Sequence, residues 1–321
     1  MEKNEVTLDA KTIHWEREAI EKLLLADVRE RRAARRWRIA KSLVWMLLFG
    51  VLLWVLITGG RLPGSAPSTG KHTAMIAIRG AIADQGEASA EYVLPALRNA
   101  LQDKGTQALV LLINSPGGSP VQAGIIHDEI RRLRKLHDKP IYAVVEESCA
   151  SAAYYIASAA DRIYVDKASI VGSIGVLING FGFVDTLHKL GVERRLITAG
   201  DNKGFLDPFS PETEAQRQHA QQLVEQIHQQ FITVVREGRG ERLKETPDMF
   251  SGLVWTGEQA VQNGLADALG SLDHVARDVA KAEKIVDFTN QKNIAERVAR
   301  RFGAATGEGA VSALREWAGV R

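Results

Sequence analysis

The sequence predicts an α/β domain with a largely parallel sheet, preceded by one transmembrane helix. Two patterns predict this class. Apolar, β-branched runs of strand length alternate with amphipathic helical stretches, which is typical of a parallel sheet covered by helices. Ahead of them, an uncharged apolar stretch from Ser42 to Thr58 is about as short as a membrane-spanning helix can be. With 321 residues, 45% of them hydrophobic, the chain is long enough for one sizeable domain plus accessory segments.

The N-terminal part divides into a cytoplasmic segment over 1–38, a transmembrane helix over 39–58 and a flexible stalk over 59–72, which is rich in Gly, Pro and Ser. The alternatives for 39–58 are a buried core helix or the apolar region of a signal peptide. The preceding segment is too long for an ordinary signal peptide and no clear cleavage site follows, so we expect a retained anchor. A basic cluster just before the helix predicts a cytoplasmic N-terminus and an exported remainder. The cluster comprises Arg29, Arg31, Arg32, Arg35, Arg36, Arg38 and Lys41.

The main domain is expected over residues 73–284, followed by a tail over 285–321 with helix-like patterning and no assigned role. Predicted strands are Met75–Ile78, Ala108–Ile113, Ile141–Val145, Arg162–Val165 and Arg195–Thr198. Predicted helices are Glu91–Asp103, Val121–Leu136, Glu212–Arg236 and Thr256–Asn263, the last ended by Gly264 as a C-terminal cap. In parallel sheets, working loops lie beyond the carboxyl ends of the strands. Functional residues are therefore sought there.

Composition excludes several kinds of site. The formal net charge is only +2 and Cys149 is the single cysteine, so an intramolecular disulfide and a thiolate-rich zinc site are both excluded. The chain has no H-E-x-x-H motif, no P-loop and no dinucleotide-binding glycine motif after a strand. We expect no nucleic-acid partner, and the mechanism that the resemblance described below implies requires no metal and no organic cofactor.

The first loop of interest is Asn114-Ser115-Pro116-Gly117-Gly118, directly after a predicted strand. Adjacent glycines let the backbone turn sharply and approach another molecule, so that amide N–H groups can point at a developing negative charge. A Pro-Gly-Gly sequence is also consistent with a simple turn, and that reading stays open here.

The second loop enters a helix at Ser148-Cys149-Ala150-Ser151-Ala152-Ala153. A strand-to-helix turn of small residues can present a nucleophile at a helix N-terminus, where free amides stabilise an oxyanion. Ser148 and Ser151 are both candidates, and either is equally suited to capping the helix. Cys149 is a rival nucleophile.

The third segment, Thr198–Gly204, contains Lys203. A lysine can act as a general base when burial and the absence of a paired carboxylate lower its pKa towards 7 to 8. Asp201 and Asp207 are close in sequence and count against this role unless they point elsewhere. Histidine is the usual base for a serine nucleophile, but no histidine of the exported domain falls in a loop beside a strand end, so nothing favours a Ser/His/Asp triad.

Taken in order, these segments resemble the signal peptide peptidase A family, serine proteases whose fold is related to the Clp protease and crotonase superfamily. NSPGG is similar to the family's glycine turn, CASAAYYIASAAD to its nucleophile segment, and VGSIGV to its T-G-S-x-G-V segment. TAGDNKGFLDPFSP is similar to the segment with the lysine base, and WTGEQAVQNGLADALG to the closing tract. The matches span about Met75 to Leu272.

The resemblance implies a role for each matched residue. Ser151 is the expected nucleophile, Lys203 the general base, and Ser173 the residue that orients the lysine amine. The backbone amides of Gly118 and Ala152 form the expected oxyanion hole. The family usually has Gly-Gly after the nucleophile, whereas this chain has Ala152 and Ala153. We expect the two methyl groups to narrow the floor of the cleft and to alter substrate preference more than activity.

The implied function is hydrolysis of peptide bonds by a serine endopeptidase with a Ser/Lys dyad, acting through an acyl-enzyme on remnant signal peptides. The implied setting is the bacterial cytoplasmic membrane, with a single-pass anchor, the catalytic domain on the periplasmic side, and a homo-oligomeric ring. Peptide substrates and the lipid bilayer are then its expected partners. Two alternatives stay open: a catalytically inactive membrane scaffold of the same fold, and a crotonase-like acyl-CoA enzyme, which export disfavours because CoA substrates are cytoplasmic.

Overall fold

The computed structural model describes residues 35–51 and 70–290, which belong to two compact units. The described part of the first unit is a helix over 35–51. Within the described ranges, no helix combines the length and the apolar character needed to cross a membrane. The predicted span covers 39–58, and its residues 52–58 lie outside the described residues, as do most of the cytoplasmic segment and of the C-terminal tail.

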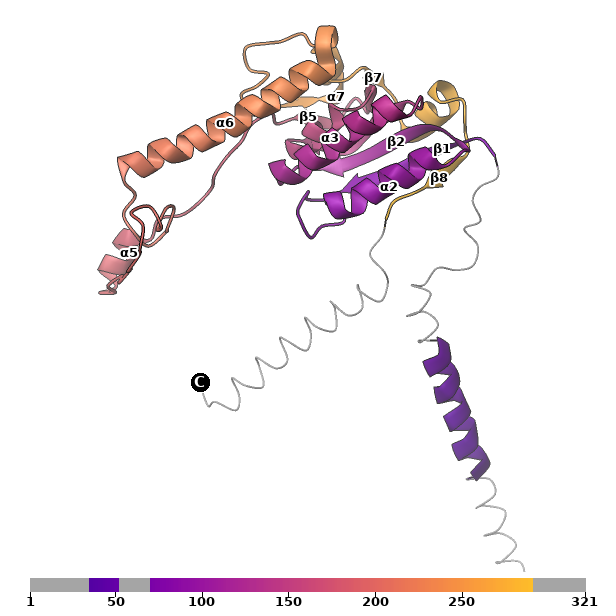
Figure 1. Ribbon diagram of the computed structural model, residues 1–321, viewed down its shortest axis with the longest axis horizontal. Helices are drawn as coiled ribbons and strands as arrows, with labels where there is room; N and C mark the ends of the chain where they lie inside the picture. Colours follow the sequence, from indigo (N-terminus) through magenta and orange to yellow (C-terminus); the bar gives the residue numbers. More distant parts are fainter. Residues whose placement is uncertain (1–34, 52–69, 291–321) are drawn as a thin grey trace, which may run out of the picture. The chain divides into compact units, whose positions relative to one another are not determined.

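The second unit, Ala66–Lys292, contains an eight-stranded, mainly parallel sheet with helices packed against it (Figure 1). Its longest path runs in the order β6-β5-β3-β2-β1-β8, with β4 beside β3 and β7 beside β4. Only the pairing of β5 with β6 is antiparallel. The strands are β1 (His72–Arg79), β2 (Thr106–Ser115), β3 (Ile141–Ala150), β4 (Arg162–Val165), β5 (Ile170–Gly172), β6 (Val254–Thr256), β7 (Ala268–Leu269) and β8 (Ile285–Asp287).

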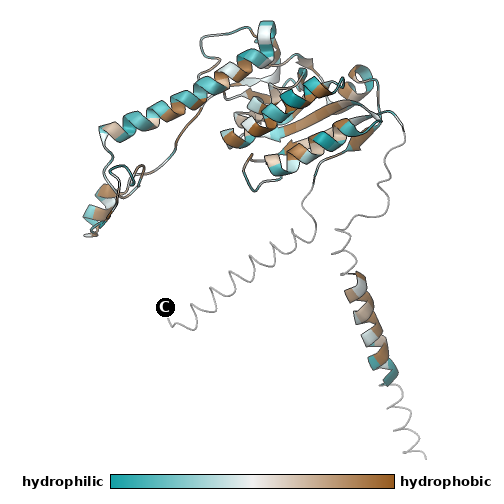
Figure 2. Ribbon diagram, viewed as in Figure 1, coloured by the Kyte–Doolittle hydropathy of each residue, from teal (hydrophilic) through white to brown (hydrophobic). Residues whose placement is uncertain are grey.

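The central strands are buried on both faces, as their continuous apolar sequence predicts. Leu109, Val110 and Leu111 of β2 are all fully buried, and Figure 2 shows apolar residues along the central strands and alternating hydropathy along the covering helices. The helices are α2 (Ala90–Gln102), α3 (Pro120–Leu136), α4 (Ala152–Ala157), α5 (Val184–Lys189), α6 (Glu214–Arg239), α7 (Gly257–Gln262) and α8 (Leu272–His274). A 3₁₀ turn (Gly240–Arg242) and a π-helical turn (Val275–Val279) complete the list.

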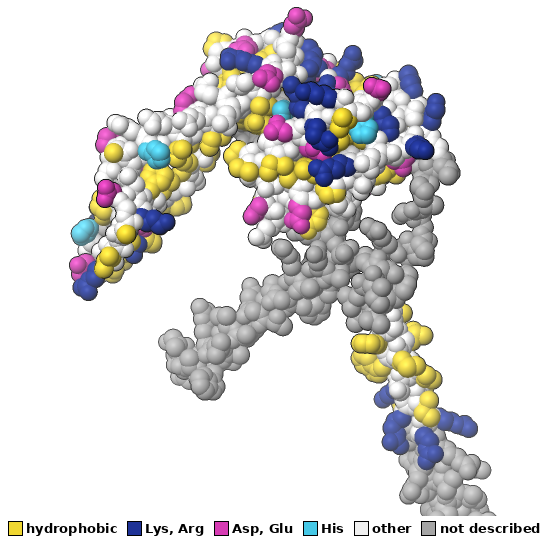
Figure 3. Space-filling model, in the orientation of Figure 1, with side chains coloured by type: hydrophobic (Ala, Val, Ile, Leu, Met, Phe, Trp, Pro, Cys, Tyr) yellow, Lys and Arg dark blue, Asp and Glu magenta, His cyan; other side chains and the backbone are white. Residues whose placement is uncertain are grey.

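Residues 176–227, which we call the arm, project away from the sheet. Helix α6 has 26 residues and is about 39 Å long, but its buried residues, Phe231, Ile232, Val235 and Arg239, all lie in its C-terminal half. Helix α5, none of whose residues is buried, lies at the opposite end of α6 from the sheet (Figure 1). Apolar side chains are exposed along the arm (Figure 3); they include Leu177, Phe181, Leu190 and Ile197.

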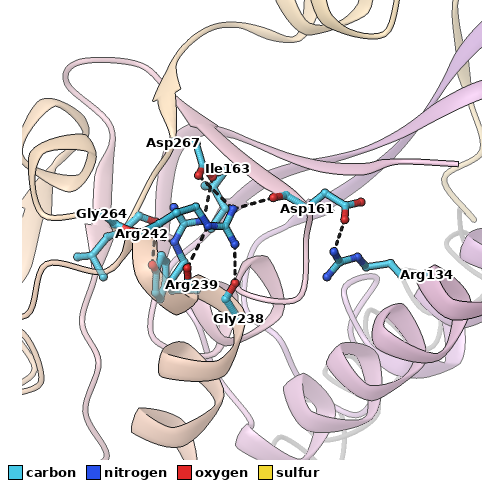
Figure 4. A network of polar contacts seen from close by, with 10 residues as sticks. Arg134, Asp161, Ile163, Gly238, Arg239, Arg242, Gly264 and Asp267 are labelled. Carbon is cyan, nitrogen blue, oxygen red and sulfur yellow. Dashed lines mark hydrogen bonds and ion pairs between the residues drawn. The ribbon is translucent and has the colours of Figure 1, made fainter. Parts of the chain in front are cut away.

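A polar network fastens the C-terminal end of α6 to the sheet (Figure 4). The buried guanidinium of Arg239 donates from Nη1 to Asp267 Oδ2 (2.8 Å) and from Nε to the carbonyl of Gly264 (2.8 Å). The same carboxylate oxygen accepts the N–H of Ile163 in β4 at 2.7 Å. Arg242 donates to the other oxygen, Asp267 Oδ1, at 3.1 Å. Asp267 therefore joins α6, the turn after it and β4.

The predicted strands in the first half of the domain are confirmed, whereas the strand Arg195–Thr198 is wrong. That segment lies in the arm without regular structure, and Ile197 is 96% exposed. A strand needs a pairing partner, and within the described residues no other strand is hydrogen-bonded to this segment. Two expected boundaries also shift. His72, assigned to the stalk, begins β1, and residues 285–287, assigned to the tail, form β8, because β1 extends its pairing at both of these points.

Candidate active site

Ser151 occupies a sharp turn between β3 and α4. Its backbone has φ 53° and ψ −125°, a conformation that costs a residue with a side chain about 1–3 kcal/mol and persists only where the surroundings enforce it. Its N–H donates to the carbonyl of Gly172 at 2.8 Å. Although Ser151 is the N-cap residue of α4, its side chain makes no capping hydrogen bond. The turn has the strained strand-to-helix form that presents the nucleophile in α/β-hydrolases.

The two rival nucleophiles are placed differently. Ser148 lies within β3, where it pairs with Ile170, so it does not stand at the turn. Cys149 is fully buried, and burial raises the pKa of its thiol far above the ordinary value. A thiol that is both protonated and inaccessible is inert. The reading of Cys149 as a rival nucleophile is therefore wrong.

Strand register brings the glycine turn beside Ser151. Ser115 at the end of β2 pairs with Cys149 in β3, and two residues further along each parallel strand are Gly117 and Ser151. A Cβ atom added to Gly117 would lie 2.7 Å from the Cβ of Ser151 and 3.1 Å from the nitrogen of Ala152. Gly117 has φ 103° and Gly118 has φ 146°, a region in which residues with side chains are rare. The Pro-Gly-Gly turn therefore approaches the serine as closely as two backbones can.

Two backbone amides are left open at this point. The N–H of Gly117 is bound by Ser115 Oγ and that of Ser119 by the carbonyl of Ile82, whereas the N–H of Gly118 has no hydrogen bond among residues 70–290. Ala152 begins α4, and the first residues of a helix have no intrahelical acceptor for their N–H groups. Gly118 and Ala152 thus supply donors of the kind that an oxyanion hole requires.

The methyl groups of Ala152 and Ala153 belong to the hydrophobic core. Ala152 is 3% exposed and Ala153 is fully buried. Almost no surface of either side chain is left for a substrate to contact, so the expected narrowing of the cleft floor is wrong. The physical reason is that α4 turns these two positions inward to pack against the sheet.

Ser173 lies next to the turn as well. It follows Gly172, whose carbonyl receives the Ser151 N–H, and it has φ 51°. Its own N–H donates to Leu253 at 2.8 Å. The next residue, Ile174, contacts His228 of α6 through a 3.1 Å bond between its carbonyl and Nε2. His228 could not be predicted as a neighbour of Ile174 from the sequence, because only the tertiary structure brings α6 to this segment.

Lys203 is the one predicted site residue that the structure does not bring to Ser151. It is exposed in the arm, and Phe205, two residues later, contacts His219 of α6 with ring centroids 5.5 Å apart. Helix α6 reaches the body of the domain at Phe231, whose ring lies 5.2 Å from that of Tyr155. From His219 to Phe231 the helix rises about 18 Å. The arm therefore holds Lys203 away from the serine of its own chain.

The carboxylates that are close to Lys203 in sequence do not form an ion pair with its amine in this conformation. Asp207 accepts Ser210 Oγ at 2.6 Å and pairs with Arg194 at 3.3 Å. Within residues 35–51 and 70–290, no carboxylate forms an ion pair with Lys203. The lysine amine thus remains available to another group.

Comparison with known proteins identifies the family of this chain. Residues 134–286 match the model of Peptidase family S49. A putative signal peptide peptidase SppA of Enterococcus faecium is 30% identical over 230 residues, 69% of this chain and 67% of that protein. Protease 4 of Haemophilus influenzae is 32% identical over 204 residues, 64% of this chain and 32% of that protein.

A further relative has a different name. The Na(+)/H(+) antiporter NhaA of Brucella melitensis is 48% identical over 176 residues, 55% of this chain. The chain spans about a quarter of that relative's length, 24%. The SppA match extends over two thirds of both proteins and agrees with the family model. This chain therefore belongs to the signal peptide peptidase A family of serine proteases, and its α/β domain with a largely parallel sheet fits the Clp-protease-like fold of that family.

Proposed function

We propose that this chain is a membrane-anchored serine endopeptidase that hydrolyses peptide bonds with Ser151 as nucleophile and Lys203 as general base. The observation that carries the proposal is the strained Ser151 turn beside two open amides, those of Gly118 and Ala152. A helix-capping serine does not need a positive φ, and Ser151 makes no capping bond. This geometry supports the proposal that Ser151 is a nucleophile beside an oxyanion hole.

The proposed reaction has two steps. The neutral amine of Lys203 takes the proton of Ser151 while Oγ attacks the scissile carbonyl, and the two amides stabilise the oxyanion. The lysine then returns the proton to the leaving amine, which gives an acyl-enzyme. A water molecule, deprotonated by the same amine, then attacks the ester; as the acyl–oxygen bond breaks, the amine returns that proton to Ser151 Oγ, which releases the acid product and restores the serine. Ser173 orients the amine throughout.

We propose that a second copy of the chain completes the dyad. The arm holds Lys203 far from Ser151 in the same chain, and its exposed apolar residues, such as Leu177 and Phe181, form a surface that a neighbouring copy can cover. Repetition of such a head-to-tail contact closes into a homo-oligomeric ring. A ring of this kind restricts entry to unfolded peptides.

The proposed substrates are remnant signal peptides, and the proposed setting is the bacterial cytoplasmic membrane with the catalytic domain on the periplasmic side. The apolar sequence over 39–58 and the basic cluster before it support a single-pass anchor with a cytoplasmic N-terminus. The name of the Enterococcus relative, a putative signal peptide peptidase, supports the substrate class.

The experiment uses the full chain in detergent micelles with a serine-reactive fluorophosphonate and a panel of signal-peptide sequences analysed by mass spectrometry. We expect labelling and cleavage by the unmodified chain, loss of both in Ser151→Ala, and loss of cleavage with retained folding in Lys203→Ala. Cleavage that persists in Ser151→Ala would assign the nucleophile elsewhere, and retained turnover in Lys203→Ala would assign the base elsewhere.

A catalytically inactive scaffold is the second candidate, and the position of Lys203 favours it, because one chain alone lacks a base beside Ser151. The same experiment separates the two functions. If the assembled, unmodified chain neither reacts with the fluorophosphonate nor cleaves any peptide of the panel, the scaffold is the better description.

A further inference from the structure

Ser115 ends β2, two residues before the first glycine of the Pro-Gly-Gly turn. Its side chain is fully buried, and its Oγ accepts the N–H of Gly117 at 3.1 Å. Pro116, between them, has no N–H to offer. A serine hydroxyl that bonds an amide two residues ahead holds the backbone in a local turn. The proposed mechanism leaves this buried hydroxyl without a role.

Two hydrogen bonds fix the two peptide planes of the glycine turn, one to the hydroxyl of Ser115 and one to the backbone of Ile82. The plane between Pro116 and Gly117 is held by Ser115 Oγ through the Gly117 N–H. The next plane, between Gly117 and Gly118, is held through its carbonyl, which accepts the N–H of Ile82 at 2.9 Å. That second plane contains the Gly118 N–H. Its direction is therefore set by contacts on both sides of Gly117.

Glycine makes these contacts necessary. Gly117 and Gly118 have no side chain to restrict φ and ψ, so sterics alone do not stop the peptide between them from rotating. Rotation would exchange the directions of the Gly117 carbonyl and the Gly118 N–H, so that an acceptor would stand where the donor now stands. Without the hydroxyl of Ser115, the Gly117 N–H would also be a buried donor with no acceptor, which favours such a rearrangement.

We propose that Ser115 is a positioning residue for the oxyanion hole: its hydroxyl fixes the Gly117 amide so that the Gly118 N–H faces the carbonyl oxygen under attack. The inference rests on the proposed function of Ser151 and extends it to a residue that does not itself touch the substrate. It concerns stabilisation of the transition state more than peptide binding.

The experiment compares Ser115→Ala, Ser115→Thr and Ser115→Cys in the full, assembled chain with a cleavable peptide. Misdirecting an oxyanion donor should lower kcat by about 10- to 100-fold, somewhat less than removal of a donor, with little change in KM. Threonine keeps the hydroxyl and should restore much of kcat. Cysteine keeps the size with a weaker acceptor and should fall between serine and alanine, so the series remains informative if one variant folds poorly.

Ser119→Ala is the matched control. Ser119 belongs to the same loop, and its Oγ caps α3 by accepting the N–H of Gln122 at 3.3 Å, so the variant loses a hydroxyl and some stability without touching the Gly117 amide. We expect its kcat to stay near that of the unmodified chain. Equal kcat losses in Ser115→Ala and Ser119→Ala, or a change in KM alone, would reduce Ser115 to a structural role and overturn the inference.

Ser151→Ala in the same series keeps the two proposals apart. If it still cleaves the peptide, the proposed function fails whatever Ser115 does. If it is inactive while Ser115→Ala retains full kcat, only the inference about Ser115 fails.

Discussion

At the scale of single residues, Ser151 combines a functional position with an unfavourable backbone conformation. A positive φ is natural for glycine and costly for serine. The surrounding bonds enforce it: the Ser151 N–H is held by Gly172, and Gly117 is packed against its Cβ. The turn is therefore strained at Ser151, the proposed nucleophile. A loss of stability at a functional residue is common in proteins.

We predict that Ser151→Gly is more stable than Ser151→Ala by about 1 kcal/mol, because glycine adopts the observed φ without strain and alanine does not. Both variants should be inactive as peptidases. Thermal or urea unfolding of the two variants measures the difference. Equal stabilities would mean that the backbone at 151 is not strained.

The turn at Ser151 could be predicted from the sequence, but the position of Ser115 beside it could not. A run of small residues between a strand and a helix indicates a tight turn, and that prediction of the turn at Ser151 is confirmed. Ser115, by contrast, reads as the last residue of an apolar strand, and only the register of β2 against β3 places it beside the turn. A serine two residues before Gly117, with a proline between, was the one signal available.

At the scale of elements, the attachment of α6 to the sheet depends on one partly buried carboxylate, that of Asp267. Burial alone would raise the pKa of Asp267, but the hydrogen bond and charge of Arg239, with the Ile163 N–H and Arg242, outweigh it and lower the pKa. The stabilisation is therefore present above the ordinary carboxylate pKa, about 3.9, and is lost as the pH falls below it through the lowered value. The attachment of the arm is thus predicted to weaken in acid.

We predict that Asp267→Asn lowers the free energy of unfolding by about 3 kcal/mol at pH 7, because it leaves the Arg239 guanidinium buried without its counter-charge. The deficit should shrink as the pH falls from 7 to 3, because below about 3.9 the unfolded chain is protonated at Asp267 before the folded chain is, which removes part of the stability that the carboxylate contributes. Urea unfolding at both pH values measures it.

Asp278→Asn is the control for this prediction. Asp278 pairs with Arg277 on the exposed surface, where an ion pair contributes little, so the variant should unfold almost as the unmodified chain does. A deficit in Asp267→Asn that is the same at both pH values would contradict the proposed electrostatic origin.

Element prediction failed where an apolar run was not buried. Met75–Ile78 and Ala108–Ile113 form strands because neighbours on both sides pair with them. Arg195–Thr198 has a comparable composition, but it lies in the arm with Ile197 exposed. Local sequence indicates what a segment can form, and the availability of a partner decides what it does form. Strand β8 was not predicted because its three residues are too few to show a sequence pattern, although it does pair with β1.

At the scale of the whole molecule, the arm separates the two residues of the proposed dyad. The sequence predicted the long helix of α6 but could not show that no residue of its N-terminal half is buried, although the rest of the arm contacts it, as Phe205 does at His219. Such exposed apolar surface is typical of an interface between subunits. The proposal that one copy supplies Lys203 to the next follows from this geometry.

We predict that co-assembled Ser151→Ala and Lys203→Ala chains recover peptidase activity that neither variant has alone. A site at a head-to-tail contact is intact when one copy retains the serine and its neighbour the lysine, which random mixing gives at about a quarter of the sites. Cleavage of a fluorogenic peptide by the mixture measures the recovery. No recovery in assemblies shown to contain both chains would favour an arm that folds back onto its own domain.

The length of α6 has a consequence for a chain that has not yet assembled with other copies. If a neighbouring copy supplies Lys203, a single chain is inactive as a protease, because the length of α6 keeps its own lysine away from Ser151. Assembly with other copies then activates the protease. The local concentration of the chain, more than any chemical modification, therefore determines when peptide cleavage begins.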